Sequence, residues 1–308
     1  MSTTLPNPPA GITFLAGLDR DLRAGLAAEI HALWSHTSTA LEGNTLTLGD
    51  TAFVLQEGLT VSGKSLRDHQ EVIGHARAID LIYAIIDQRH AVTAEDLHQL
   101  HRAMQTEHVV DAFNPSGRWK VEPNGTTALQ SSGASQWHDY ARPEHVASLM
   151  AEWLDQLARM RKAGAPDPLD DYTDLHLGFT AIHPYADGNG RMARLLANIP
   201  IIERGEVPVL IPSERRRDYL IQMGDWSIAC GAPVPDQPLV PRMAARTSLR
   251  DFFATVSQPA RDLVAAYRQR QTGRREGGRH HDRHQLRFNN NPALGGEVGP
   301  ELARDSST

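Results

Sequence analysis

The sequence of 308 residues has a single cysteine, no long apolar run and no excess of basic charge. The one cysteine, Cys230, excludes an internal disulfide framework and a cysteine-rich zinc module. No apolar stretch approaches the roughly 20 residues that span a bilayer, and the first residues lack the basic start and apolar stretch of a signal peptide. We therefore expect a soluble cytoplasmic protein. The formal net charge of −6 argues against a nucleic-acid partner, because nucleic-acid-binding proteins usually show a clear basic excess.

The two ends of the chain differ in composition from its body. Residues 1–11 hold three prolines and are expected to form a loose lead-in. Residues 271–308 are rich in Gly, Arg, His and Asn and have few large apolar side chains. Such a segment buries too little apolar surface to offset its loss of conformational entropy, so we expect a disordered tail.

Apolar residues recur at intervals of three and four along most of the chain, which predicts a mainly helical protein. Asp19 and Thr93 are suitable N-caps, and Pro143 suits a first helical turn. Gly205 suits a helix end. Predicted helices lie over about residues 18–33, 66–87, 93–104, 143–157, 169–182, 192–202 and 243–269.

The exception to the helical pattern lies within residues 118–130. Asn124-Gly125 separates two short runs of β-forming residues, at 119–121 and 126–129. Asn-Gly in that setting is a hairpin signal, although Pro123 limits the first run to an edge strand. We therefore expect an all-α protein with one small β-hairpin flap, in which residues 123–125 form the turn.

The most informative segment is the loop of residues 183–194, which lies between two strongly apolar predicted helices. Gly188-Asn189-Gly190 at the opening of a helix lets backbone N–H groups converge on an anion, and the helix N-terminus adds a favourable dipole. Asn189 can add a side-chain donor. Arg191 and Arg194 are three residues apart, so they share a helix face and can both reach a polyphosphate.

Two further side chains in this loop suit the same chemistry. Asp187 offers a carboxylate oxygen of the kind that Mg²⁺ prefers, and His183 is a neutral base near physiological pH. Taken singly, Gly-Asn-Gly is most often a turn, and lone arginines most often lie on a solvated face. All of these elements within twelve residues predict a phosphate-transfer site.

Residues 183–194 resemble the signature loop of the Fic-domain family: His, an aromatic two residues on, Asp or Glu, Gly-Asn-Gly-Arg, then a second Arg. In that family the loop joins two helices of an all-α core and holds ATP–Mg²⁺ while a target hydroxyl attacks the α-phosphorus. The resemblance implies that His183 is the general base and that Asp187 binds Mg²⁺. It also implies that Gly188, Asn189 and Gly190 form the anion hole, while Arg191 and Arg194 hold the β- and γ-phosphates.

The loop departs from the family pattern at one position. Tyr185 stands where phenylalanine is usual, and its hydroxyl needs a partner if the ring is buried. Gly190 matches the branch that transfers nucleotides, because the phosphorylating death-on-curing branch carries lysine there.

A second stretch also resembles this family. Ser38-Thr39-Ala40-Leu41-Glu42-Gly43-Asn44 is similar to the Fic inhibitory motif, in which Ser or Thr precedes Glu by four residues. The resemblance implies that Glu42, flanked by Ser38 and Gly43, pairs with Arg194 and takes the donors that the γ-phosphate would use. The other interpretation is a helix C-terminus capped by Gly43, and the two can hold together.

The resemblance covers about residues 30–225 and implies an organisation for the whole chain. Residues 1–70 would form the N-terminal inhibitory region and residues 71–230 the catalytic core, with the flap near 118–130. Residues 231–270 would form a C-terminal helical extension, followed by the disordered tail at 271–308. The flap would add a strand to the target. Tyr219 is a candidate for contact with the adenine, the alternative being a core tyrosine.

The resemblance implies an autoinhibited protein adenylyltransferase, which would carry out AMPylation by moving AMP from ATP to a Ser, Thr or Tyr hydroxyl of a target protein. ATP and Mg²⁺ are the expected ligands and the target protein is the expected partner; a homodimer is left open. Two alternatives remain. The same site could remove AMP from a modified protein (deAMPylation), with Glu42 positioning water, or the chain could be a non-catalytic interaction module.

Overall fold

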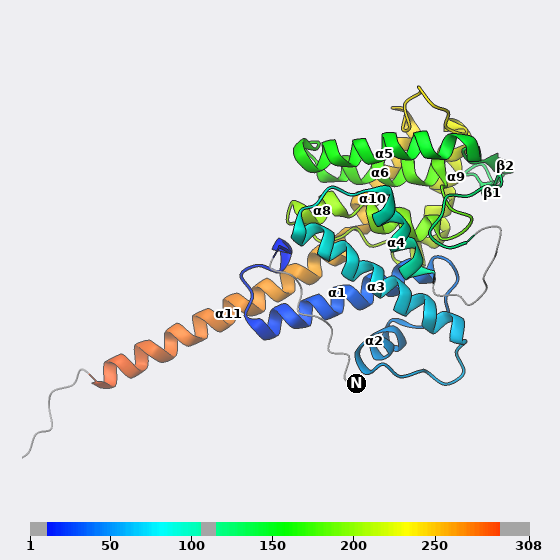
Figure 1. Cartoon of the computed structure of the whole chain (residues 1–308). Helices are drawn as coiled ribbons and strands as arrows, with labels where there is room; N and C mark the ends of the chain where they lie inside the picture. Colours follow the sequence, from blue (N-terminus) through cyan, green and yellow to red (C-terminus); the bar gives the residue numbers. More distant parts are fainter. Residues whose placement is uncertain (1–10, 106–114, 290–308) are drawn as a thin grey trace, which may run out of the picture. The chain divides into compact units, whose positions relative to one another are not determined.

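The computed structural model describes residues 11–105 and 115–289, with side chains as far as residue 276. Residues up to Tyr267 pack as one compact unit, and a second unit begins at Arg268. Helices dominate the described residues, as the sequence predicts (Figure 1). In order along the chain, the elements are η1 (Thr13–Leu15), α1 (Arg20–Ala40), α2 (Leu48–Glu57), α3 (Leu66–Gln88), α4 (Ala94–Met104), β1 (Gly125–Leu129), β2 (Ser135–Asp139), α5 (Pro143–Ala163), α6 (Pro168–Ile182), α7 (Asn189–Leu196), α8 (Ile199–Glu203), η2 (Ser213–Arg215), α9 (Arg216–Cys230), α10 (Ala244–Val256) and α11 (Gln258–Asn289).

The helix starts follow local sequence signals. Thr93 forms a capping box with Asp96 at the start of α4, and Pro143 lies in the first turn of α5. Thr47 forms a similar capping box at the start of α2, which the apolar pattern did not predict. The helix α9 was also not predicted, because the apolar Leu220 lies off its buried face and the small residues Gly224 and Ser227 lie on it, which weakens the apolar pattern. Among the described residues, no helix is long and apolar enough to cross a membrane.

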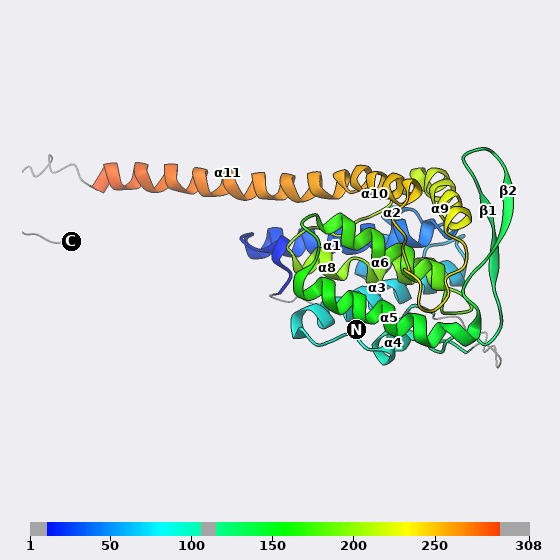
Figure 2. The same cartoon turned by 90° about the horizontal axis from the view of Figure 1, so that it is seen from above.

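The helix α6 is almost entirely buried. Its side chains are buried on every face, including Tyr172, Leu175 and Phe179, which are fully buried. The helix α5 lies beside it in both views (Figures 1 and 2), and Trp153 of α5 donates from Nε1 to the Leu175 carbonyl at 2.9 Å. Burying one large apolar side chain contributes about 1.5–3 kcal/mol to the free energy of unfolding. A well-anchored α6 therefore fixes the loop that follows it.

The small hairpin is present, but its turn lies later than the sequence indicates. Strands β1 and β2 pair antiparallel from Gly125–Asp139 to Leu129–Ser135, so the turn lies at residues 130–134. Residues 123–125 do not form the turn because the segment before β1 is tied to the loop after α6; Asn124 Nδ2 donates to the Tyr185 carbonyl at 3.1 Å. The hairpin lies against α9 (Figure 2), where the Ser131 N–H donates to Asp225 Oδ1 at 3.0 Å.

Two of the predicted helices are divided in the structure, and the last helix runs on into the predicted tail. The predicted helix over 192–202 is divided into α7 and α8, because Pro200 in the first turn of α8 has no backbone N–H to donate to the preceding turn. The predicted helix over 243–269 is divided at Ser257. The helix α11 continues past residue 270 to Asn289, since extending an existing helix costs far less than starting one. The rest of the expected tail, residues 290–308, lies outside the described residues, as do residues 1–10.

Candidate active site

The loop between α6 and α7 carries the residues predicted to form the site. His183 follows α6 with a left-handed backbone (φ 51°), and Gly188 precedes α7 with φ 77°. Asn189 holds the loop closed: its Oδ1 accepts from the Tyr185 N–H at 2.9 Å, and its Nδ2 donates to the Tyr185 carbonyl at 2.8 Å. Its amide is therefore used inside the loop instead of serving as the extra donor expected from the sequence. Backbone N–H groups at the start of α7 are left as donors for an anion.

His183 lies against Tyr140, with the two rings stacked at a centroid distance of 3.6 Å. Its Nδ1 is 3.3 Å from the Thr180 carbonyl oxygen. In the neutral ring Nδ1 therefore carries the proton and donates, and Nε2 keeps a free lone pair. Burial, helped by the charge of Lys120, lowers the pKa of His183 to about 3. The ring is neutral at physiological pH and can accept a proton at Nε2.

Lys120 connects the segment before the flap to the same loop. Its backbone N–H donates to the Pro184 carbonyl at 2.8 Å, and its Nζ donates to the Ile182 carbonyl at 3.3 Å and to Asn124 Oδ1. Burial lowers the pKa of Lys120 to about 8. These contacts join the flap to the loop at its beginning.

The Tyr185 hydroxyl, which a phenylalanine at this position would lack, has a partner in the structure. The ring is fully buried and stacks on His101 at a centroid distance of 3.8 Å. Its hydroxyl lies 3.2 Å from His98 Nδ1. The extra oxygen relative to phenylalanine is therefore satisfied by a hydrogen bond, and the ring still anchors the loop in the core.

Asp187 is the acidic side chain of the loop, and 71% of its side chain is exposed. Its carboxylate Oδ2 accepts from Gln105 Nε2 at 3.2 Å and lies 3.5 Å from Arg191 Nη2. Burial would raise the pKa of Asp187, but Arg191, the Gly188 N–H and Gln105 together bring it below its ordinary value. The carboxylate is ionised at neutral pH.

The described residues hold no group of three or more His, Cys, Asp or Glu side chains that could bind a metal ion by themselves. A single ionised carboxylate nevertheless fits Mg²⁺, because this ion usually takes one or two protein carboxylates and completes its shell with phosphate and water oxygens.

Arg191 is buried, yet two of its nitrogens have no partner. Its Nη2 donates to Gln105 Oε1 at 3.3 Å. Its Nε and Nη1 make no hydrogen bond with any described residue. Buried guanidinium donors are costly to leave unpaired. Arg191 therefore has two donors that a bound anion could pair, in the first turn of α7.

Arg194, one turn further along α7, has its donors engaged by the N-terminal region. Its Nη2 donates to Glu42 Oε1 at 2.6 Å and to the Ser38 carbonyl at 2.9 Å, and its Nε donates to Ser38 Oγ at 3.2 Å. Glu42 follows directly on the end of α1, and Gly43 has φ 101°. The pairing implied by the family resemblance and the helix-end interpretation of this segment are both present.

Gly190 lies close to the side chains of both Glu42 and Arg194. A Cβ at this position would come within 2.9 Å of Glu42 Oε1 and 3.1 Å of Arg194 Nη1. A larger residue would make the Glu42 carboxylate or the Arg194 guanidinium shift, so glycine leaves room for the ion pair in its present position.

The residues after Glu42 are fixed to α3. Asn44 Nδ2 donates to Glu71 Oε2 at 2.9 Å and to the Asp68 carbonyl at 3.0 Å. Thr45 Oγ1 donates to Asp68 Oδ2 at 2.6 Å. Residue 42 is therefore placed by contacts on both sides, with α1 before it and α3 after it.

Tyr219 is a core tyrosine, which was the alternative to a role at the adenine. It is buried, its hydroxyl lies 3.0 Å from His176 Nε2, and it also hydrogen bonds to Arg194. Burial lowers the pKa of His176 to about 3, and the charge of Arg194 adds to this shift. Tyr219 therefore supports Arg194 from the side of the core.

Several residues at the site were not selected from the sequence: Lys120, Tyr140, His101 and Gln105. Their partners lie between 43 and 86 positions away along the chain. His101 on α4, for example, has its Nε2 3.0 Å from the Asp187 carbonyl oxygen. No short motif could have indicated these contacts, because they depend on where α4 and the flap pack.

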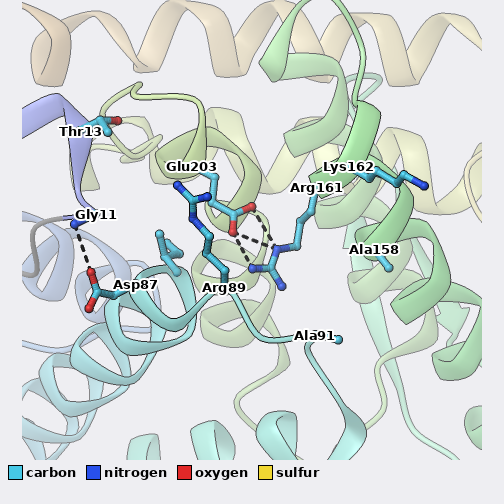
Figure 3. A pocket seen from close by; sticks show the side chains of 10 residues that line it. Gly11, Thr13, Asp87, Arg89, Ala91, Ala158, Arg161, Lys162 and Glu203 are labelled. Carbon is cyan, nitrogen blue, oxygen red and sulfur yellow. Dashed lines mark hydrogen bonds and ion pairs between the residues drawn. The ribbon is translucent and has the colours of Figure 1, made fainter.

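A separate cleft of about 730 Å³ opens near the ends of α3, α5 and α8 (Figure 3). Arg161 crosses it and pairs with Glu203, with Nε 3.0 Å from each carboxylate oxygen. Arg161 Nη1 also donates to the His90 carbonyl at 2.7 Å. None of the predicted site residues lines this cleft.

The chain is similar to known proteins. The Fic/DOC family model matches residues 91–201. Protein adenylyltransferase fic-1 of Caenorhabditis briggsae is 32% identical over 193 residues, which is 62% of this chain and 36% of that protein. Protein adenylyltransferase Fic of Drosophila grimshawi is 32% identical over 185 residues, 59% of this chain and 35% of that protein. The chain thus spans about a third of the length of the curated relatives it matches.

Solved structures share the fold. A Fic domain containing signaling protein from Bacteroides thetaiotaomicron has a TM-score of 0.72 at 24% identity, covering 84% of this chain and 95% of that one. The Caenorhabditis elegans Fic-1 structure has a TM-score of 0.60 at 25% identity, covering 82% of this chain and 66% of that one. The helical core, the loop and the hairpin therefore belong to a fold that is already known.

Proposed function

We propose that this chain, which carries a Fic/DOC domain at residues 91–201, is a protein adenylyltransferase that moves AMP from ATP to a Ser, Thr or Tyr hydroxyl of another protein. The observation that carries the proposal is the buried Arg191, whose Nε and Nη1 are unpaired among the described residues and lie beside the start of α7. Such donors suit a polyphosphate. The curated relatives, which bear the name protein adenylyltransferase, support the same activity.

The reaction makes one bond and breaks one. The target hydroxyl oxygen bonds to the α-phosphorus of ATP, the bond from that phosphorus to the bridging oxygen breaks, and pyrophosphate leaves with the bonding electrons. The hydroxyl proton passes to His183 Nε2, since Nδ1 is engaged with the Thr180 carbonyl. The low pKa of free His183 makes it a weak base, and the negative charge of bound ATP would raise that pKa toward the useful range.

The start of α7 would hold the phosphates. Backbone N–H groups of Gly188, Asn189 and Gly190 would face the α- and β-phosphates at the positive end of the helix. Arg191 would donate to the phosphates with Nε and Nη1. Arg194 would take the γ-phosphate once Glu42 has withdrawn.

Asp187 would provide the protein ligand for Mg²⁺. When bound, the ion would neutralise phosphate charge and hold the leaving group. The support for this role is that Asp187 is ionised, largely exposed and adjacent to Arg191.

We further propose that Glu42 inhibits the protein by competing for Arg194. The ion pair at 2.6 Å uses the guanidinium edge that a γ-phosphate would need. ATP could displace Glu42 only to the extent that it binds the displaced state more tightly. Ser38 and Gly43 support this inhibited arrangement, one as a second acceptor for Arg194 and the other as the left-handed residue after Glu42.

The hairpin is proposed as the docking surface for the target protein. Trp137 on β2 and Val121 before β1 are 60% and 66% exposed, and exposed side chains of this kind suit contact with a partner. Lys120 and Asn124 join this surface to the loop that holds His183. A target strand added to the hairpin would place its hydroxyl near that loop.

One observation favours the alternative function, removal of AMP from a modified protein. The Glu42 side chain is 43% exposed, so its carboxylate could also orient a water molecule for hydrolysis. Incubating the wild-type chain with a target already modified by the Glu42→Gly variant separates the two, because only the alternative predicts loss of the AMP group.

Mass spectrometry of the intact chain tests the main proposal. Glu42→Gly, incubated with ATP and MgCl₂, is expected to gain the mass of AMP on itself or on an added protein target. The matched control is the Glu42→Gly/His183→Ala double variant, which should gain nothing. If Glu42→Gly stays unmodified and also shows no ATP binding by calorimetry, the proposal is wrong.

A further inference from the structure

Gln105, at the end of α4, contacts both Asp187 and Arg191. Its Nε2 donates to Asp187 Oδ2 at 3.2 Å, and its Oε1 accepts from Arg191 Nη2 at 3.3 Å. A Cβ on Gly188 would come within 2.9 Å of the same Nε2. The carboxamide therefore lies against the opening of the loop and joins two residues that the proposed function assigns to the cation and to the phosphates.

The position of Gln105 is set by backbone packing. Its N–H donates to the His101 carbonyl at 2.9 Å, closing the last turn of α4. His101 in turn binds the Asp187 carbonyl at 3.0 Å and stacks on Tyr185. The end of α4 is thus docked on the loop, and this contact brings the Gln105 side chain to the site.

The spacing of the ion pair shows what the carboxamide does. Asp187 and Arg191 are four residues apart, and their closest atoms lie 3.5 Å apart. Charge-assisted hydrogen bonds between Arg and a carboxylate normally close to about 2.7–2.9 Å. Here the carboxamide satisfies one donor of the arginine and one oxygen of the carboxylate, so the two charges are linked through an amide and do not close on each other.

We propose, on the basis of the adenylyltransferase function above, that Gln105 is a positioning residue that keeps Asp187 and Arg191 apart and thereby available for a divalent cation and a nucleotide phosphate. A direct Arg–Asp pair would consume a phosphate donor and a cation ligand together. A neutral amide is easier to displace from Asp187 than a guanidinium, because the amide donor carries no formal charge and is not attracted to the carboxylate as an ion. When a cation binds Asp187, the hydrogen bond from Gln105 Nε2 to Asp187 breaks and the one from Arg191 to Gln105 Oε1 remains.

The quantity that reports this role is the coupling between cation and nucleotide. The Kd of ATP is measured by calorimetry with MgCl₂ and with EDTA, and the ratio of the two values is the coupling. The Glu42→Gly/His183→Ala background of the full chain is used, so that ATP can enter and no transfer takes place.

Two substitutions separate positioning from simple space filling. Gln105→Met keeps the length of the side chain and removes both hydrogen bonds, so the direct ion pair forms and the coupling is expected to fall about tenfold. Gln105→Glu keeps the acceptor for Arg191 and adds a carboxylate oxygen beside Asp187, so the coupling is expected to stay equal or rise. Gln99→Met, on an exposed position of α4, is the matched control and should leave the coupling unchanged.

The outcomes are distinguishable. If Gln105→Met keeps the coupling within about twofold of the background while ATP still binds, the positioning role is wrong and the proposed function stands. Equal losses in Gln105→Met and Gln105→Glu would also overturn it, because only a steric role treats the two alike. If the background variant itself binds no ATP, the proposed function fails and this inference fails with it.

Discussion

Two arginines one turn apart on α7 are in opposite states. Arg191 and Arg194 are both buried, with 4% of each side chain exposed. Arg191 leaves two donors unpaired among the described residues, whereas Arg194 is bound by Ser38 and Glu42. The same residue type on the same helix therefore keeps two unpaired donors at one position, whereas at the other its donors are taken by an internal carboxylate. The difference arises from what packs beside each: the end of α4 beside Arg191, and the end of α1 beside Arg194.

The comparison indicates how the site could be both built and inhibited. Two donors of Arg191 have no acceptor among the described residues, so ATP would not have to displace a protein group from them. Arg194 must exchange one anion for another, which makes its contribution depend on the competition with Glu42. The predictions below test this difference, beginning with the largest expected effect.

Removing Arg191 is expected to cause the largest loss of transfer activity. In the Glu42→Gly background, Arg191→Ala should lower the transfer rate by about 100- to 1,000-fold, because a preorganised donor to the phosphates is lost from a buried site. Arg191→Lys, which keeps the charge but not the planar fork, should recover little of it. Transfer is followed with α-labelled ATP. A loss of less than about tenfold in Arg191→Ala would show that the unpaired donors do not serve the nucleotide.

Removing Glu42 frees Arg194 and should strengthen the binding of ATP. Glu42→Gly is expected to lower the Kd of ATP by about 10- to 100-fold, since hydrogen bonds to charged groups contribute about 1.5–3 kcal/mol each. Glu42→Gln keeps the shape and removes the charge, so its Kd should lie between those of wild type and Glu42→Gly. Calorimetry measures all three. An unchanged Kd in Glu42→Gly would mean that Glu42 does not compete with ATP.

The pH dependence of stability tests the buried histidines beside the two arginines. Burial, with a contribution from Arg191, lowers the pKa of His101 to about 4, and burial together with Arg194 lowers that of His176 to about 3. Both folded-state values lie below the ordinary value of 6.5, so between the two the unfolded chain binds more protons. The free energy of unfolding is therefore highest above about pH 6.5 and should fall by about 1–2 kcal/mol per histidine on going to pH 5.

Urea denaturation at pH 7 and pH 5 measures this loss. His101→Asn and His176→Asn should each reduce the difference between the two pH values. A stability that does not depend on pH in the wild-type chain would mean that these rings are not held neutral by the fold.

The smallest expected effect on ATP binding comes from removing one of the acceptors that contact Arg194. Ser38→Ala removes the acceptor of the 3.2 Å bond from Arg194 Nε and leaves the Ser38 carbonyl and Glu42 in place. Arg194 then resembles Arg191 in having an unpaired buried donor. The Kd of ATP should fall about threefold, which corresponds to part of one hydrogen bond. Weaker ATP binding in Ser38→Ala would contradict this expectation, provided that thermal unfolding of the variant is unchanged.

Different parts of the molecule were predictable to different degrees. The helices α3 to α6 follow apolar spacing and caps such as Thr93 and Pro143, because these signals are local. The hairpin turn was misplaced, since the interactions of Lys120 and Asn124 with the loop, which are distant in sequence, outweigh the local preference of Asn-Gly. The extent of α11 was underestimated because polar composition alone was taken to indicate disorder.

The sequence by itself determined the chemistry available at the loop: a histidine, a carboxylate, two glycines that open a helix and two arginines on one face of it. It also indicated, through resemblance, which glutamate faces Arg194. Only the tertiary structure decided that two donors of Arg191 are unpaired among the described residues, that Gln105 contacts both Asp187 and Arg191, and that Tyr219 is a core residue. The physical reason is that residue type and spacing set which groups lie on a helix face, whereas the partner of each buried donor depends on which distant element packs against that face.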